Sequence, residues 1–166
     1  MKTKELTITA IFVALIIVQN FVLFNFPITL TYTILYFLTQ KLADKKLPFL
    51  AVLVFVIVKN IIMPALIPTI IFDLVGLMVF ISVCLIKQKS IRYILIPISI
   101  VFHLLVLDLS TIILTVNVIV NLKDILLLWI TQISLGFVAY IYAPLSIVLI
   151  LILDGLNYLS DLDLDE

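Results

Sequence analysis

Long runs of apolar residues, separated by short polar breaks, constrain this chain more than any other feature. Hydrophobic residues make up 65% of its 166 residues, whereas soluble domains contain about 45–50%. Most runs approach the roughly 20 residues that an α-helix needs to cross the hydrocarbon core of a bilayer. They lack the alternation of barrel strands, and an open sheet would leave backbone groups unpaired in lipid. We therefore predict an all-α integral membrane protein.

The polar breaks divide the chain into six predicted transmembrane helices, which form one bundle and a single domain over residues 1–166. Pro48 is placed to start the third helix, and Pro64 and Pro68 mark the turn that follows it. Pro144 predicts a kink or a break within the last helix. The predicted helices cover about residues 6–25, 28–42, 48–63, 69–86, 93–116 and 125–153.

The distribution of Lys and Arg predicts the orientation of this bundle. Cytoplasmic loops of membrane proteins carry an excess of these residues. In a six-helix topology one side holds eight of them, and the opposite side holds only Lys123 outside the helices. The eight are Lys2, Lys4, Lys41, Lys45, Lys46, Lys87, Lys89 and Arg92. We therefore predict a multi-pass protein of the cell membrane with both termini in the cytoplasm.

The sequence contains no pattern typical of a catalytic or cofactor site. HExxH, GxSxG and Walker patterns are absent, and the single cysteine, Cys84, excludes an internal disulfide and a Cys-based metal site. Asp73 and Asp108 could pair as in aspartic proteases, but neither has the sequence context of an intramembrane protease. No basic patch supports nucleic-acid binding. We therefore predict no enzyme activity, no metal, no cofactor and no nucleic-acid partner.

Four ionisable residues fall at membrane depth in the predicted helices, where a charge is costly and marks function by default. Their depths follow from the helical rise of about 1.5 Å per residue. Lys59 lies roughly 16 Å above the cytoplasmic end, and Asp73 lies about 6 Å below the outer end. His103 falls near mid-depth, and Asp108 lies roughly 24 Å up. The polar groups therefore gather in the outer half of the bundle.

This gathering predicts a pocket that opens to the outside. Trp129 would stack on a flat ring, while carboxylate and amide groups would take its hydrogen bonds. The predicted substrate-binding residues are Asp73, Asp108, Asn117, Trp129 and Gln132. Several polar residues also have a structural alternative. Lys59 would simply pair with Asp73 or Asp108, His103 would be a packing residue, Trp129 would anchor at the lipid interface, and Asn117 would belong to an ordinary loop.

The first predicted helix begins Lys-Glu-Leu-Thr-Ile-Thr-Ala-Ile-Phe-Val-Ala, in which Ala10 and Ala14 lie one turn apart on one face. Small residues at this spacing let another helix approach closely, and ordinary packing within the bundle is the alternative use. A short charged start, an early A-x-x-x-A pattern and six helices in so short a chain resemble the S components of energy-coupling factor (ECF) vitamin transporters. The link near Pro27 and the second helix are shorter than is usual in that family.

The resemblance implies a substrate-capture subunit of an ATP-driven importer. Such a subunit docks through the Ala10 and Ala14 face on a shared transmembrane coupling subunit, and two cytoplasmic ATPase subunits drive release. ATP hydrolysis would therefore belong to the partners. One aromatic platform and few charges favour a small heteroaromatic vitamin or precursor, which is pyridoxine-like or hydroxymethylpyrimidine-like.

Two other functions remain open from the sequence. The chain would be a self-contained, proton-coupled secondary carrier if Lys59, Asp73 and Asp108 formed a proton relay. No inverted repeat or matched pair of broken helices supports that alternative. The chain would otherwise be a structural membrane subunit that transports nothing.

Overall fold

A computed structural model describes residues 3–22, 29–62, 64–65, 67–115, 123, 126–127, 130–131 and 137–160. The described residues form six helices and no strand, which confirms the all-α prediction. The helices are α1 (Thr3–Val22), α2 (Thr29–Lys41), α3 (Leu47–Ile62), α4 (Ile67–Cys84), α5 (Lys89–Thr115) and α7 (Phe137–Ser160). Residues 123, 126, 127, 130 and 131 are also helical.

Two of the described segments are long and apolar enough to cross a membrane, namely the 18 residues of α4 and the 20 residues Lys89–Asp108 of α5. The apolar stretches Leu47–Ile62 and Pro144–Leu156 are shorter. Apolar length alone therefore identifies two candidate spans among the described residues.

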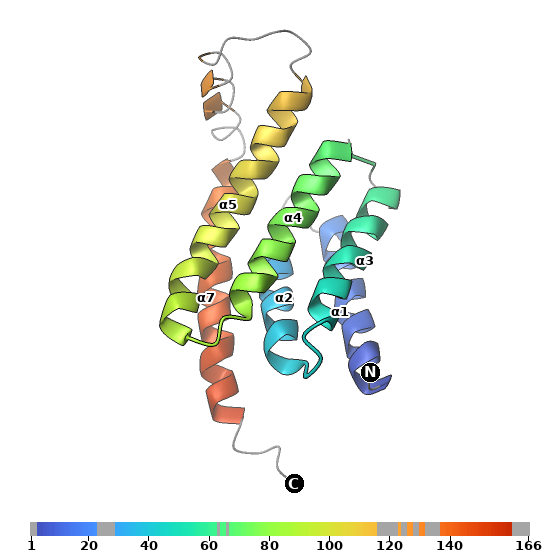
Figure 1. The fold of residues 1–166 in the computed structure, drawn as a ribbon, viewed down its shortest axis with the longest axis vertical. Helices are drawn as coiled ribbons and strands as arrows, with labels where there is room; N and C mark the ends of the chain where they lie inside the picture. The colour runs from blue at the N-terminus through green and yellow to red at the C-terminus, as the bar shows by residue number, and fades with distance from the viewer. Residues whose placement is uncertain are drawn as a thin grey trace.

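The helices run alternately up and down the long axis of a bundle, as Figure 1 shows. The start of α1, the α2–α3 and α4–α5 connections and the end of α7 all lie at the lower end of that view. The Glu5 carboxylate accepts a hydrogen bond of 3.0 Å from the backbone amide of Ala43, which ties the start of α1 to the α2–α3 connection. The Lys45 ammonium donates to the carbonyls of Thr39 and Leu42 and so caps the last turn of α2.

The short helix α2 lies in the middle of the bundle and packs against α1, α3, α4 and α7. Its largest side chains, those of Tyr32 and Tyr36, are 1% and 0% exposed. Aliphatic residues of the surrounding helices complete the core, among them Ile16, Val52 and Ile100. A central helix with polar side chains brings hydrogen-bonding groups to the middle of an otherwise apolar bundle.

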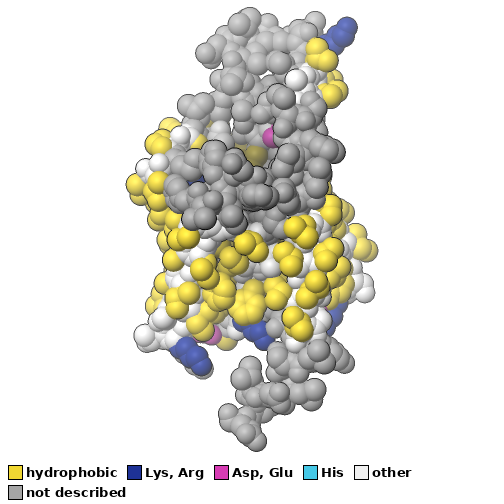
Figure 2. All heavy atoms as spheres, turned by 180° about the vertical axis from the view of Figure 1, so that it is seen from behind, with side chains coloured by type: hydrophobic (Ala, Val, Ile, Leu, Met, Phe, Trp, Pro, Cys, Tyr) yellow, Lys and Arg dark blue, Asp and Glu magenta, His cyan; other side chains and the backbone are white. Residues whose placement is uncertain are grey.

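The outer surface of the described residues is rich in large apolar side chains. Ile61 and Ile67 are 73% and 72% exposed, and other exposed aliphatic residues lie on α1, α3, α4, α5 and α7. Figure 2 shows hydrophobic side chains over most of the described part of one face, with Lys and Arg side chains at its lower edge. Soluble monomers rarely expose apolar patches larger than a few hundred Å², so this surface is unusual for a protein in water.

Two helices differ most from their predicted limits. Helix α5 starts at Lys89 instead of near residue 93, so that Arg92 lies inside a helix and not in a cytoplasmic loop. Helix α7 passes through Pro144 without a break and continues to Ser160, beyond the predicted end at residue 153. The extension past residue 153 is possible because Asp154 turns towards partners inside the bundle, as described below.

Candidate functional site

Four polar side chains from four helices form a continuous chain of hydrogen bonds inside the bundle. The Tyr32 hydroxyl of α2 lies 2.8 Å from Nδ1 of His103 on α5, and Nε2 of His103 lies 3.1 Å from Oδ1 of Asp73 on α4. The Lys59 ammonium of α3 lies 2.7 Å from the other oxygen of Asp73. We call these four residues the upper quartet. It cross-links α2, α3, α4 and α5.

The groups of the upper quartet satisfy one another. With a neutral ring protonated at Nε2, His103 donates to Asp73 and accepts from the Tyr32 hydroxyl, while Lys59 donates to the remaining carboxylate oxygen. The side chains of His103 and Asp73 are 2% and 6% exposed, whereas that of Lys59 is 35% exposed. A buried charge is tolerated only when it is paired and hydrogen-bonded. The Lys59 ammonium is the member of the cluster that reaches the surface.

Gly76 provides the space for the His103 ring. A Cβ atom at position 76 would lie 2.1 Å from Cδ2 and 2.6 Å from Cγ of His103. The ring therefore packs directly against the backbone of α4, one turn away from Asp73. Tyr32 makes edge contacts with both His103 and Phe80, at centroid distances of 5.9 and 5.0 Å. These contacts fix the ring between its two hydrogen-bond partners.

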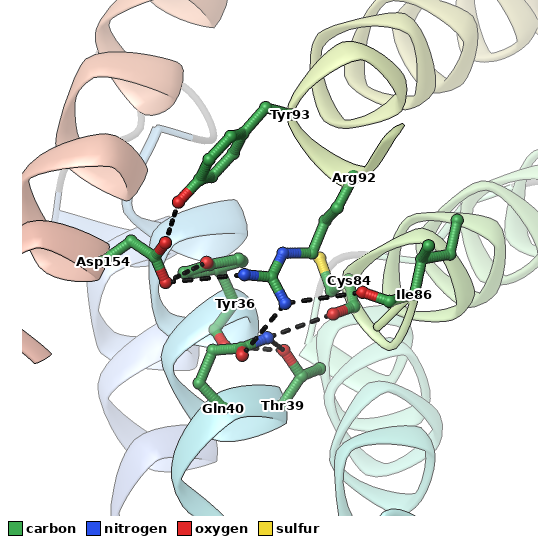
Figure 3. A network of polar contacts seen from close by, with 8 residues as sticks. All are labelled: Tyr36, Thr39, Gln40, Cys84, Ile86, Arg92, Tyr93 and Asp154. Carbon is green, nitrogen blue, oxygen red and sulfur yellow. Dashed lines mark hydrogen bonds and ion pairs between the residues drawn. The ribbon is translucent and has the colours of Figure 1, made fainter. Parts of the chain in front are cut away.

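A second polar cluster, which we call the lower network, is drawn in Figure 3. It lies near the lower end of the bundle, where α4 ends and α5 begins. Asp154 of α7 accepts hydrogen bonds from the hydroxyls of Tyr36, at 2.7 Å, and Tyr93. A guanidinium nitrogen of Arg92 lies 3.6 Å from the same carboxylate. The side chains of Arg92 and Asp154 are only 7% and 11% exposed. The lower network thus joins α2, α5 and α7.

Arg92 extends the lower network to α4. Its Nη1 donates to the Gln40 side-chain oxygen at 3.4 Å and to the Ile86 carbonyl at 3.5 Å. Gln40 in turn donates to the Cys84 carbonyl at 3.0 Å, at the last residue of α4. The guanidinium also lies over the rings of Tyr36 and Tyr93, within cation–π range. A residue expected in a solvated loop is therefore the centre of a buried cluster.

The structure brings together two of the predicted site residues, Lys59 and Asp73. Asp108 is partly buried on α5, five residues beyond His103. Asn117, Trp129 and Gln132 lie outside the described residues.

Ala10 and Ala14 lie on the exposed face of α1. A neighbouring stripe of the same helix carries the buried residues Thr9, Val13 and Ile16. The small side chains of the two alanines therefore border the outer surface of the bundle.

Sequence reasoning missed several members of the two clusters. Tyr32 was not identified, and His103 was assigned less weight than Asp73, although it bridges Asp73 and Tyr32. Two sequence features could have pointed to these residues. One is Gly76, three residues after Asp73, and the other is the run of polar residues in α2. The last predicted helix ends at residue 153, so Asp154 falls outside it, whereas α7 continues to Ser160.

No known protein family, curated protein or solved structure matches this chain. In the described part of the chain, no group of three or more His, Cys, Asp or Glu side chains is placed to hold a metal ion. The arrangement of the two clusters is therefore the main basis for a functional proposal.

Proposed function

We propose that this protein is a multi-pass membrane protein whose helices form a bundle surrounded by lipid. The distribution of side chains supports this proposal, since large aliphatic groups lie on the outside while Asp73, His103 and Arg92 are buried. Lipid is the environment in which such an arrangement is stable. Lys and Arg side chains lie at the lower end (Figure 2), where α1 also begins and α7 ends, and this supports a cytoplasmic location for that end.

Within the membrane, the protein serves as the substrate-capture subunit of an ATP-driven importer of the ECF type. The observation that carries this proposal is the upper quartet, because ionisable groups inside a lipid-facing bundle are rare and mark solute or ion sites. The exposed side chains of Ala10 and Ala14 support a docking role, since small side chains let a partner helix approach closely. The solute is a small heteroaromatic vitamin or precursor, pyridoxine-like or hydroxymethylpyrimidine-like.

Affinity purification from native membranes tests this function. A tagged chain should bring down a second membrane subunit and a pair of ATPase subunits. Ala14→Trp should abolish this recovery because the added volume blocks a close helix crossing. Val148→Trp is the matched control, because Val148 is also exposed but lies on α7. Recovery of the wild-type chain without ATPase subunits contradicts the proposal.

A second candidate, a proton-coupled carrier, is favoured by the continuity of the upper quartet. Its three hydrogen bonds connect a tyrosine, a histidine, an aspartate and a lysine without a gap, which is how proton relays in transporters are built. Liposomes that contain the purified chain alone distinguish the two functions. Solute uptake driven by a proton gradient, without ATP or partner subunits, supports the carrier and contradicts the capture subunit.

A further inference from the structure

Two buried amide oxygens have no hydrogen-bond partner within the described part of the chain, namely Oε1 of Gln19 and Oδ1 of Asn60. Gln19 is 8% exposed. Asn60 uses its amide nitrogen in a hydrogen bond of 2.7 Å to the Val56 carbonyl, and its oxygen remains unpaired. Most buried polar atoms in folded proteins are paired. An unpaired acceptor is also costly, so two at one end of a bundle need an explanation.

The two amides lie at similar heights on neighbouring helices. α1 and α3 pack against each other, and both rise from the lower end of the bundle. Gln19 lies about 24 Å along α1 from its first residue, and Asn60 lies about 20 Å along α3 by the same rise of 1.5 Å per residue. Both positions therefore belong to the upper end of the α1–α3 pair.

Both side chains are also on inward-facing stripes of their helices. Gln19 follows Val13 and Ile16 at helical spacing, and both of these residues are buried. Asn60 lies one turn beyond Val56, which is 2% exposed. The unpaired oxygens are therefore not explained by an orientation towards lipid or water.

The chemistry of the two groups defines what would satisfy them. Each is an acceptor, so a ligand must supply N–H or O–H donors. Lys59 precedes Asn60 on α3 and carries a positive charge that already pairs with Asp73, which disfavours a cationic ligand. The members of the upper quartet already pair with one another. The unpaired oxygens therefore indicate a ligand more directly than the charged groups do.

We propose that the amide oxygens of Gln19 and Asn60 accept hydrogen bonds from a neutral solute with two donor groups, such as a heteroaromatic ring bearing amino and hydroxymethyl substituents. This inference rests on the proposed capture function and places the contacts on α1 and α3. It adds residues that are distinct from Asp73, Asp108, Asn117, Trp129 and Gln132. Without solute, the two oxygens destabilise the protein, and binding removes that penalty.

Thermal unfolding of the purified protein tests the site with pyridoxine, 4-deoxypyridoxine and 4-amino-5-hydroxymethyl-2-methylpyrimidine as probes. Gln19→Met and Asn60→Leu keep much of the side-chain volume and remove the acceptor. Without solute, each variant should unfold at a higher temperature than the wild type, since the unpaired group is gone. Each should also lose at least ten-fold in affinity for the probe that binds the wild type best, and 4-deoxypyridoxine should bind the wild type more weakly than pyridoxine does.

Thr9→Val is the matched control. Thr9 lies on the inward face of α1, but its hydroxyl already donates to the Glu5 carbonyl at 2.8 Å, so this variant should bind the probe as the wild type does. If Gln19→Met and Asn60→Leu bind the probe normally, the site is wrong while the capture function stands. If no probe stabilises the wild type and no ATPase subunits co-purify, the capture function fails. If the two variants unfold at the wild-type temperature or below it without solute, the claim that these two oxygens are unpaired in the free protein is refuted, whatever the ligand is.

Discussion

Replacement of Gly76 by alanine should disrupt the upper quartet through one steric contact. The new Cβ would lie 2.1 Å from Cδ2 of His103, whereas carbon atoms prefer about 3.5–4.0 Å. The ring must therefore retreat by roughly 1.5 Å. That movement exceeds the tolerance of the bonds to Tyr32 and Asp73, which are 2.8 and 3.1 Å long.

The magnitude follows from three contributions. Overpacking of a filled site costs about 1–3 kcal/mol, and weakening a hydrogen bond to a charged group costs about 1.5–3 kcal/mol. Alanine gains about 1 kcal/mol over glycine in helix propensity. Gly76→Ala should therefore lower the free energy of unfolding by about 1.5–5 kcal/mol. Denaturant titration in detergent micelles, followed by circular dichroism, measures this change.

A double-mutant cycle isolates the cause. In the His103→Ala background the ring is absent, so Gly76→Ala should become neutral or stabilise by up to about 1 kcal/mol. The coupling between the two positions should be at least about 1.5 kcal/mol. Gly155→Ala is the matched control because nothing lies within 4 Å of its added Cβ, and it should not destabilise α7. An equal loss from Gly76→Ala with and without the His103 ring would refute the reasoning.

Three further predictions concern the same clusters. Asp73→Asn removes the negative charge that pairs with the Lys59 ammonium and should cost about 2–4 kcal/mol in unfolding free energy. This is less than for a fully buried pair because Lys59 is one-third exposed. Denaturant titration in micelles measures the change, and no loss of stability would mean that the pair is dispensable. Asp154→Asn weakens the acceptor of two tyrosines and Arg92 and should cost about 1.5–3 kcal/mol in the same assay, with a wild-type midpoint as the contradicting result. The buried thiol of Cys84 should react with a maleimide only after denaturation, and fast labelling of the folded protein would contradict its burial.

The sequence was sufficient for the helical class because apolar runs of this length leave few alternatives in lipid. It also predicted that Lys59 could pair with Asp73. It did not identify Tyr32 or the bridging role of His103, because contacts between residues 71 positions apart depend on tertiary packing. Arg92 looked like a loop cation for the same reason. Its buried partner, Asp154, comes from the far end of the chain.

The limits of the helices were harder to predict than their existence. Pro144 and Gly155 are local helix-breaking signals, but neither ends α7. Proline within a helix costs about 3 kcal/mol and glycine about 1 kcal/mol, and packing of α7 against α2 and α5 offsets such costs. Local helix-breaking residues alone therefore do not locate the end of this helix.

The membrane topology is the claim on which the capture function and the solute site both depend. Single cysteines at Ala65 and Ser90, in a Cys84→Ala background, test it directly, since both positions are exposed and lie at opposite ends of the bundle. In right-side-out membrane vesicles, an impermeant maleimide should label Ala65→Cys at once and Ser90→Cys only after permeabilisation. Labelling of both positions from the same side would contradict the account.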